Sequence, residues 1–414
     1  MSEIKQGYKQ TKVGIIPEDW EIVKLGKLTT VETGKTPLRS NKQFWDNGTI
    51  NWATTTEVNE TYIVSTNEKI TNQAVAELKM KILPINTILL AMYGQGKTRG
   101  KVALLRIEST INQAFASIKP NKNYSTNFIF NYLDKSYEKI RDLSHGSNQD
   151  NLNLDIVKAL QIPLPPLKEQ EKIAEILTTW DEAITKQTEL LEAKELQKKA
   201  LMQKLLSGEV RFDGFSDKWK EVRIDKLFDF KKGQELSKEK LEKNGIFECI
   251  LYGELYTTYS EVISEIKSKT NIKEGIKSKI DDILIPASTT TSAIDLAIAS
   301  TIQKDNVLIG GDINILRKKT NNINGEFISK YLTHIKKMEI AKYAQGITII
   351  HLYSKDFKHL KIQLPSLPEQ QKIAEVLSLA DDEINLLKNE LEELKLQKKA
   401  LMQKLLTGEV RVKV

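Results

Sequence analysis

The sequence predicts an α+β protein in which two globular mixed α/β domains in tandem are separated by two long helices. The helices are expected to pack as an antiparallel coiled coil with pseudo-twofold symmetry. Three observations predict this architecture: an internal repeat at an offset of 200 residues, a heptad pattern within the repeated segments, and short strand-like runs elsewhere. The 414 residues, 40% of them hydrophobic, are enough for more than one domain core.

The repeat is clearest at the ends of the two halves. LQKKALMQKLLSGEVR (Leu196–Arg211) returns as LQKKALMQKLLTGEVR (Leu396–Arg411), with fifteen of sixteen positions identical. Upstream, LPPLKEQEKIAEIL (Leu164–Leu177) aligns with LPSLPEQQKIAEVL (Leu364–Leu377). The chain therefore divides into a first domain at residues 1–163, a first helix at 164–210, a second domain at 211–363 and a second helix at 364–414.

Both repeated segments read as long helices. Their apolar residues follow the alternating three- and four-residue steps of a coiled-coil seam over about 39 residues, or about 58 Å. Prolines precede each segment, and Gly208 and Gly408 follow at the positions where helices end. The first seam carries Gln187 and Lys194 where the second has leucines, so either the helices separate there or these residues contact a partner protein.

Two equal seams in one chain most simply pack on each other, and an ordinary dimerising coiled coil with another chain is the alternative. Packing requires apolar residues at the seam but not an identical outer surface. A repeated external partner would explain the identity, although recent duplication or recombination between fixed helices would also produce it. The candidate partner-docking residues are Lys198, Lys199, Gln203, Lys398, Lys399 and Gln403.

Composition limits the classes of function. The single cysteine, Cys249, excludes a disulfide framework, and no histidine stands at metal-ligand spacing, so we expect no metal site. The polar N-terminus and the lack of a long apolar run predict a cytoplasmic protein without a membrane span. The formal net charge is +7, and the stretches Glu169–Ser207 and Glu369–Thr407 each carry −2, so the remainder carries +11. A polyanion partner is therefore expected at the globular domains.

The two domains hold short strand-like runs separated by polar turns, which predicts a mixed or antiparallel sheet. The expected strands are Thr87–Met92, Lys101–Ile107, Phe115–Lys119, Asp282–Pro286 and Asn314–Arg317. Helices are expected near Asn127–Leu143 and Phe327–Tyr343.

One loop of the first domain resembles a phosphate-binding motif. AMYGQGKT (Ala91–Thr98) fits a relaxed Walker A pattern, but a strand-like segment follows it where a phosphate loop would open a helix. We therefore interpret it as a basic, glycine-rich loop that meets phosphates and base edges, with a solvated turn as the alternative. The candidate DNA-binding residues of this loop are Tyr93, Gln95, Lys97, Thr98, Arg99 and Lys101.

Two further polar runs are candidates for the same role. Thr54, Thr55 and Thr56 form one in the first domain, and Ser288, Thr289, Thr290 and Thr291 lie in the second domain where the first has its glycine loop. Different residues at equivalent loops are what two different half-site specificities would require. No methyltransferase, nuclease, helicase or triad pattern accompanies them, so no catalytic residue is predicted.

These segments resemble the specificity (S) subunit of type I restriction–modification systems. The resemblance rests on the two helix motifs, on the opening VGIIPEDWEIVKLGKL, and on TILLAMYGQGKTRGKVALLRIESTINQAF and DDILIPAS within the domains. It covers essentially the whole chain.

The resemblance implies two target recognition domains, each of which reads one half of a bipartite, asymmetric site in double-stranded DNA. The helices would act as a spacer and dock two modification subunits that methylate adenine, and restriction subunits would complete the enzyme. No cofactor is expected in this chain, because S-adenosylmethionine, ATP and Mg²⁺ would bind to the partner subunits. The alternative from the residues alone is a coiled-coil adaptor that joins proteins without reading DNA.

Overall fold

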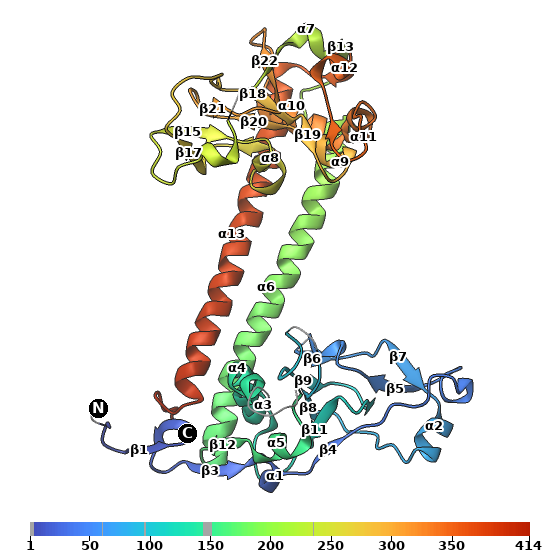
Figure 1. The fold of residues 1–414 in the computed structure, drawn as a ribbon, viewed down its shortest axis with the longest axis vertical. Coiled ribbons are helices and arrows are strands. Elements are labelled where there is room, and N and C mark those ends of the chain that lie inside the picture. The colour runs from blue at the N-terminus through green and yellow to red at the C-terminus, as the bar shows by residue number, and fades with distance from the viewer. Residues whose placement is uncertain (1–3, 60, 95–96, 144–150, 235) are drawn as a thin grey trace. The chain divides into compact units, whose positions relative to one another are not determined.

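The computed structural model describes residues 4–59, 61–94, 97–143, 151–234 and 236–414. The chain forms two compact units, Met1–Thr188 with Asn389–Val414, and Glu189–Lys388. Both long helices cross the unit boundary, so each unit holds one globular domain, the first half of one helix and the second half of the other (Figure 1). The predicted division treated each helix as a separate segment, whereas the compact units share both helices.

Besides the second half of the second long helix, the first unit contains twelve strands and six α-helices within the described ranges. Its strands are β1 (Tyr8–Thr11), β2 (Gly14–Pro17), β3 (Glu21–Lys24), β4 (Val31–Thr33), β5 (Ile50–Ala53), β6 (Tyr62–Ile63), β7 (Glu68–Ile70), β8 (Ile88–Ala91), β9 (Val102–Leu105), β10 (Thr110–Ile111), β11 (Phe115–Ile118) and β12 (Gln161–Leu164). Its helices are α1 (Leu25–Leu28), α2 (Asn72–Glu77), α3 (Thr126–Lys135), α4 (Tyr137–Asp142), α5 (Leu154–Ala159) and the start of α6 (Leu167–Ser207), with the 3₁₀ turns η1 (Lys42–Phe44) and η2 (Glu57–Asn59).

The second unit repeats most of this order. Its strands are β13 (Lys220–Arg223), β14 (Phe228–Lys232), β15 (Phe247–Ile250), β16 (Val262–Ile263), β17 (Ser268–Thr270), β18 (Asp282–Pro286), β19 (Ser288–Thr289), β20 (Ser300–Ile302), β21 (Leu308–Ile309), β22 (Ile313–Lys318), β23 (Ile350–His351) and β24 (Lys361–Leu364). Its helices are α7 (Ile224–Leu227), α8 (Glu254–Thr257), α9 (Ala293–Leu296), α10 (Gly325–His334), α11 (Lys337–Ala341), α12 (Ser354–Phe357) and the start of α13 (Leu367–Leu405), with the 3₁₀ turn η3 (Lys238–Lys240).

Each domain is built on a mixed five-stranded sheet, which confirms the predicted class. The strand order is β4-β11-β8-β9-β6 in the first domain and β14-β22-β18-β20-β16 in the second, and the last pair of each is parallel. A three-stranded sheet accompanies each, in the orders β10-β5-β7 and β17-β15-β21.

The central strands are apolar at successive positions because both faces of the sheet are buried. In β8, Ile88 and Leu90 join one core cluster, while Leu89 and Ala91 join another on the opposite face. Strand β18 alternates in the same way. Successive side chains of a strand point to opposite faces, so these runs lack the polar alternation of a half-exposed strand.

The long helices begin and end as the prolines and glycines predict. Gly208 and Gly408 have φ values of +74° and +72°, the left-handed conformation that glycine adopts most easily after a helix. At the other end, Gln170 and Gln370 are buried. The Gln170 amide donates to the Pro165 carbonyl and accepts from the backbone N–H of Ser125, the N-cap of α3. The Gln370 amide donates to the Pro365 carbonyl and accepts from the backbone N–H of Asn324, the N-cap of α10.

The two long helices pack antiparallel within each unit, as predicted. In the first unit Gln187 contacts Glu390, and in the second Lys194 contacts Glu383, so residue numbers rise along one helix as they fall along the other. The predicted seam is confirmed where Ile384 and Leu387 are only 7% and 8% exposed.

Candidate nucleic-acid interface and helix surface

The glycine-rich loop of the first domain joins β8 to β9, which are antiparallel neighbours. No helix follows it, so the predicted strand–loop–strand geometry is confirmed and the loop lacks the helix N-terminus that a phosphate loop needs. Gly94 and Gly100 have φ values of +145° and +87°, backbone conformations that glycine adopts more readily than other residues. The phenol of Tyr137 in α4 donates to the Lys97 carbonyl at 2.8 Å and ties the loop to that helix.

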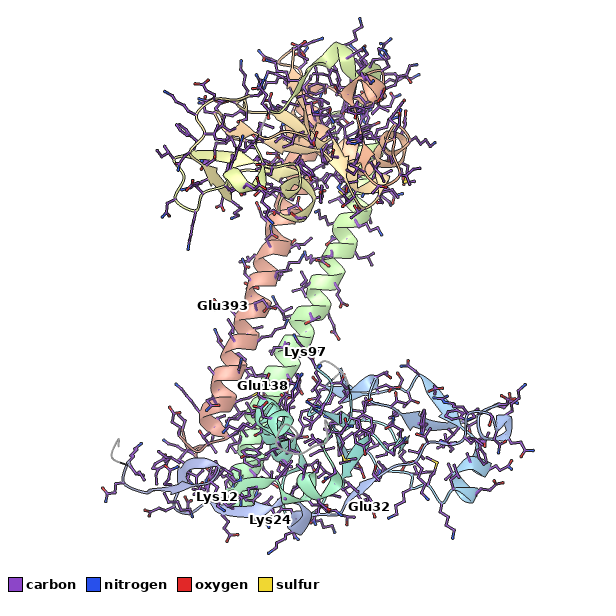
Figure 2. All side chains as sticks on the ribbon, viewed as in Figure 1. Lys12, Lys24, Glu32, Lys97, Glu138 and Glu393 are labelled. Carbon is purple, nitrogen blue, oxygen red and sulfur yellow. The ribbon has the colours of Figure 1, made fainter. Side chains whose placement is uncertain are left out.

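Side chains of this loop differ in exposure. Tyr93 and Lys97 are exposed, and Figure 2 labels Lys97 at the edge of the first domain. Thr98, Arg99 and Lys101 are half-buried. Gln95 lies outside the described residues. Two of the predicted contacts are therefore directly accessible to a polyanion.

The threonine run of the first domain follows β5 and is held by Glu57. The Glu57 Oε2 atom accepts hydrogen bonds from the Thr54 backbone N–H at 2.9 Å, the Thr54 hydroxyl at 2.7 Å and the Thr56 hydroxyl at 2.9 Å. Thr54 and Thr55 are half-buried, and Thr56 is exposed. The carboxylate thus orders a turn that presents a short polar surface.

The polar run of the second domain is partly structural. Ser288 and Thr289 form β19, which pairs with β23, and their side chains are 5% and 2% exposed. Thr290 and Thr291 are exposed, and the Thr291 hydroxyl donates to Asp295 at 2.5 Å. The four residues expected to act together therefore separate into a buried pair and an exposed pair, a difference that residue type does not reveal.

The repeated outer string of the helices also divides into inward and outward residues. Lys198 forms an ion pair with Asp381, and Lys398 forms its counterpart with Asp181. These two candidate docking lysines are thus used within the helix pair. Their identity in both copies has an internal reason as well as the predicted external one.

The other candidate docking residues face outward. Lys199, Gln203, Lys399 and Gln403 are exposed. Beside them, Leu196 and Leu396 are 69% and 65% exposed, which is high for leucine at the same position of two repeated helices. We call these six side chains the repeated outer surface.

The two polar positions of the first seam are satisfied within the helix pair. The Gln187 amide donates to Glu390 at 2.9 Å, and Lys194 pairs with Glu383 at 2.7 Å. Neither of the two expected explanations, separation of the helices or contact with a partner, is needed. Acidic residues on the facing helix compensate for the missing leucines.

Residue patterns did not reveal the ion pairs that join the helix ends. Arg411 binds the buried Glu169 through two hydrogen bonds of 2.7 and 2.8 Å, and Arg211 binds Glu369 through two of 2.8 Å. All four residues recur at the 200-residue offset, which is the signal that could have identified them. The glutamates stand in the first helical turns, where the helix dipole also favours them.

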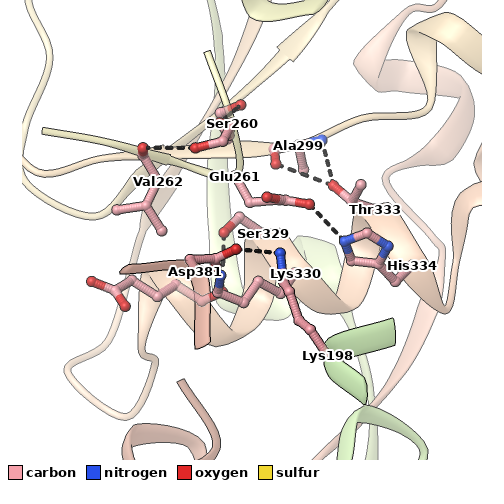
Figure 3. A network of polar contacts seen from close by, with 12 residues as sticks. Lys198, Ser260, Glu261, Val262, Ala299, Ser329, Lys330, Thr333, His334 and Asp381 are labelled. Atoms are coloured by element: carbon pink, nitrogen blue, oxygen red, sulfur yellow. Dashed lines mark hydrogen bonds and ion pairs between the residues drawn. The ribbon is translucent and has the colours of Figure 1, made fainter. Parts of the chain in front are cut away.

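A buried polar network lies where α10 meets the long helices in the second unit (Figure 3). Lys330 is 1% exposed, and its ammonium group binds Asp381 at 2.7 Å. Nearby, His334 Nε2 and Glu261 Oε1 are 2.6 Å apart. Burial raises the pKa of Glu261, but hydrogen bonds from His334 and from its own backbone N–H, together with the charges of His334 and Lys330, outweigh burial and lower that pKa to about 2.

The first unit has no equivalent lysine. Lys330 is the sixth residue after Asn324, the N-cap of α10. The sixth residue after Ser125, the N-cap of α3, is Asn131, so Asn131 is the equivalent of Lys330. The two residues make different contacts: the Asn131 amide donates to the Asn127 carbonyl of its own helix at 2.7 Å, whereas Lys330 pairs with Asp381 of the long helix.

Within the described ranges, no three histidine, cysteine or carboxylate side chains come together in a way that could ligate a metal ion. None of the helices in those ranges has the length and apolar character that a bilayer crossing requires.

Comparison with known proteins connects this arrangement to a family. The family described as the type I restriction modification DNA specificity domain matches twice, at residues 17–195 and 216–396. The chain is 26% identical to the putative type I restriction enzyme MjaX specificity subunit of Methanocaldococcus jannaschii, across 99% of this chain and 98% of that protein. It is 36% identical to the MjaIX specificity subunit of the same organism, across 45% of this chain and 44% of that one.

A solved structure supports the fold. The crystal structure of a type I restriction–modification system S subunit from M. genitalium is similar with a TM-score of 0.60 and 18% sequence identity, over 97% of both chains. Because the family domain matches twice and accounts for most of the sequence, this chain belongs to the type I restriction–modification DNA specificity family, as a specificity subunit with two target recognition domains.

Proposed function

We propose that each domain reads one half of a bipartite, asymmetric site in double-stranded DNA, and that the chain performs no chemistry itself. The observation that carries the proposal is the duplicated framework with different residues at equivalent loops. The β8–β9 loop presents Tyr93 and Lys97, whereas the corresponding β18–β20 segment presents Thr290 and Thr291. Lysine suits phosphates and guanine, and hydroxyl groups suit several base edges.

The repeated outer surface supports a second part of the proposal, the docking of two modification subunits. Its exposed leucines are flanked by lysine and glutamine in both copies, which gives one apolar contact with a polar rim on each helix. Restriction subunits complete the assembly. S-adenosylmethionine, ATP and Mg²⁺ belong to these partners, and the chain selects the DNA sequence on which they act.

The test is methylome sequencing of a methylation-free host that expresses this chain with its modification subunits. The expected result is methylated adenine within one motif of two defined blocks around a fixed gap. A chimera that carries another family member's first domain should change one block only. Methylation or DNA binding without sequence selection at any salt concentration would contradict the proposal and favour the adaptor alternative.

A further inference from the structure

The loop that follows β5 in the first domain has an equivalent after β15 in the second. Both strands are central in their three-stranded sheets, with an antiparallel neighbour on one side and a parallel one on the other. The first loop contains Thr54, Thr55 and Thr56, and the second contains Leu251, Tyr252 and Gly253. The offset here is 197 residues instead of 200, so a comparison at the repeat offset does not align the two loops.

A glutamate closes both loops in the same way. Glu57 accepts the Thr54 N–H at 2.9 Å, and Glu254 accepts the Leu251 N–H at 2.7 Å. The second oxygen of each carboxylate reaches the segment that precedes or begins the next antiparallel strand. It accepts from the Asn67 N–H at 3.2 Å in the first domain and from the Ser268 hydroxyl in the second.

These carboxylate hydrogen bonds fix the backbone of both loops, although the residues between the bonded positions differ. A carboxylate that accepts hydrogen bonds from two separate segments holds the loop in one conformation, so less conformational entropy is lost when the loop binds a ligand. The glutamates therefore have the same role in two loops of different sequence.

The loop of the second domain borders a cavity that suits an aromatic ring or base edge. Tyr252 is 37% exposed, its ring lies 6.4 Å from that of Tyr256, and both line a cavity of about 570 Å³ together with Lys238 and Leu251. A tyrosine offers an apolar face and a hydroxyl group, and an exposed lysine at the rim offers a positive charge for a phosphate.

The second polar loop lies close to this cavity. Helix α8, which carries Tyr256, packs against β18, and β18 leads into the segment with Thr290 and Thr291. Burial, and to a smaller extent Tyr252, raises the pKa of Tyr256, although a hydrogen bond with Thr289 opposes this rise.

We infer that Tyr252 is a specificity-determining residue of the second domain and that Glu57 and Glu254 are positioning residues for equivalent reading loops. The ligand is a duplex DNA base pair whose edge meets the Tyr252 ring and hydroxyl, with Lys238 at the adjacent phosphate. This inference rests on the proposed function and names the residues that carry it in the second domain.

The first experiment compares methylomes of the complete methyltransferase containing the wild-type chain or Tyr252→Thr. One good base contact contributes about 1–3 kcal/mol, so methylation of the original motif should fall about 5- to 150-fold, with relaxed selection in one block only. Tyr252→Phe keeps the ring and should give a smaller loss in the same block. Tyr353→Thr, in the same domain, is the matched control because Tyr353 is 39% exposed and lies outside the candidate reading loops, and it should leave the motif unchanged.

The second experiment tests the positioning role. Glu254→Gln should relax selection in the block affected by Tyr252→Thr, while the unfolding midpoint of the complex stays near that of the wild type. Glu57→Gln should relax the other block. An unchanged motif in both Tyr252 variants would overturn the inference, and equal loss in both blocks from Glu254→Gln would overturn the positioning role. A wild-type complex without any bipartite motif would instead overturn the proposed function.

Discussion

Arg411 and Glu169 form a two-point ion pair that joins the segment after the second long helix to the start of the first. Arg411 also binds Asp19, and these hydrogen bonds, first that to Glu169, raise the pKa of the guanidinium above its ordinary value. Glu169 additionally accepts from the Trp20 indole N–H at 3.2 Å. In the second unit Arg211 binds Glu369 in the same way.

Replacing Arg411 by alanine should destabilise the first unit, because it leaves the Glu169 carboxylate buried without a cation. We expect a loss of about 3 kcal/mol, the lower end for a broken buried pair, since the Arg411 side chain is 40% exposed. Urea unfolding measures the change. Adding Glu169→Gln to Arg411→Ala should restore part of the stability. Replacement of an exposed residue such as Lys399 should change stability by less than about 0.5 kcal/mol, and a loss that small for Arg411→Ala would contradict this role.

Asp381 and Lys330 should respond unequally to substitution. Asp381→Ala leaves the Lys330 ammonium group buried and unpaired, so we expect a loss of about 3–5 kcal/mol. Lys330→Met removes the buried charge itself and fills a similar volume, so its effect should be small or even stabilising. Unfolding of the two single variants provides the comparison. Equal losses would show that Lys330 contributes through something other than this ion pair.

Glu261 should make part of the stability dependent on acidity. Its pKa in the folded protein is about 2, below the ordinary value of 4.5. The carboxylate therefore stabilises the fold fully above about pH 4.5, and this contribution disappears as the pH falls toward 2. The stability difference between wild type and Glu261→Gln should be largest at pH 6 and shrink by pH 3. Glu265→Gln, at an 80% exposed side chain, is the control and should change stability little at either pH.

The repeated outer surface should bind the modification subunits. Leu196→Glu and Leu396→Glu should each weaken one docking site by about tenfold or more, as expected when a charge enters an apolar contact. Mass measurement of the assembled complex should then show one modification subunit where the wild type binds two. Leu379→Glu is the matched control: Leu379 is 60% exposed, but residue 179 in the other helix is threonine. If all three variants assemble alike, docking occurs elsewhere.

Much of the fold follows from local patterns. The helix limits follow from prolines before and glycines after a heptad seam, and strand β18 occupies the expected range, residues 282–286. These features depend on neighbouring residues and on the period of the side chains, so the chain itself displays them.

The candidate site was only partly predictable because exposure depends on residues far away in the sequence. Ser288 and Thr290 have similar side chains, but pairing of β19 with β23 buries the first and leaves the second exposed. Equivalence of Thr54 with Leu251 was hidden by a three-residue change of offset, and the shared sheet positions revealed it.

The sequence alone determined the duplication, the two long helices and the family. Tertiary structure decided which of the repeated side chains face inward, because pairs such as Arg411 with Glu169, 242 positions apart, form only when the folded chain brings them together. Tertiary structure also gives Lys198 and Lys199 different roles. Lys198 pairs with Asp381 on the facing helix, whereas Lys199, about 100° further around the helix, remains exposed for a partner.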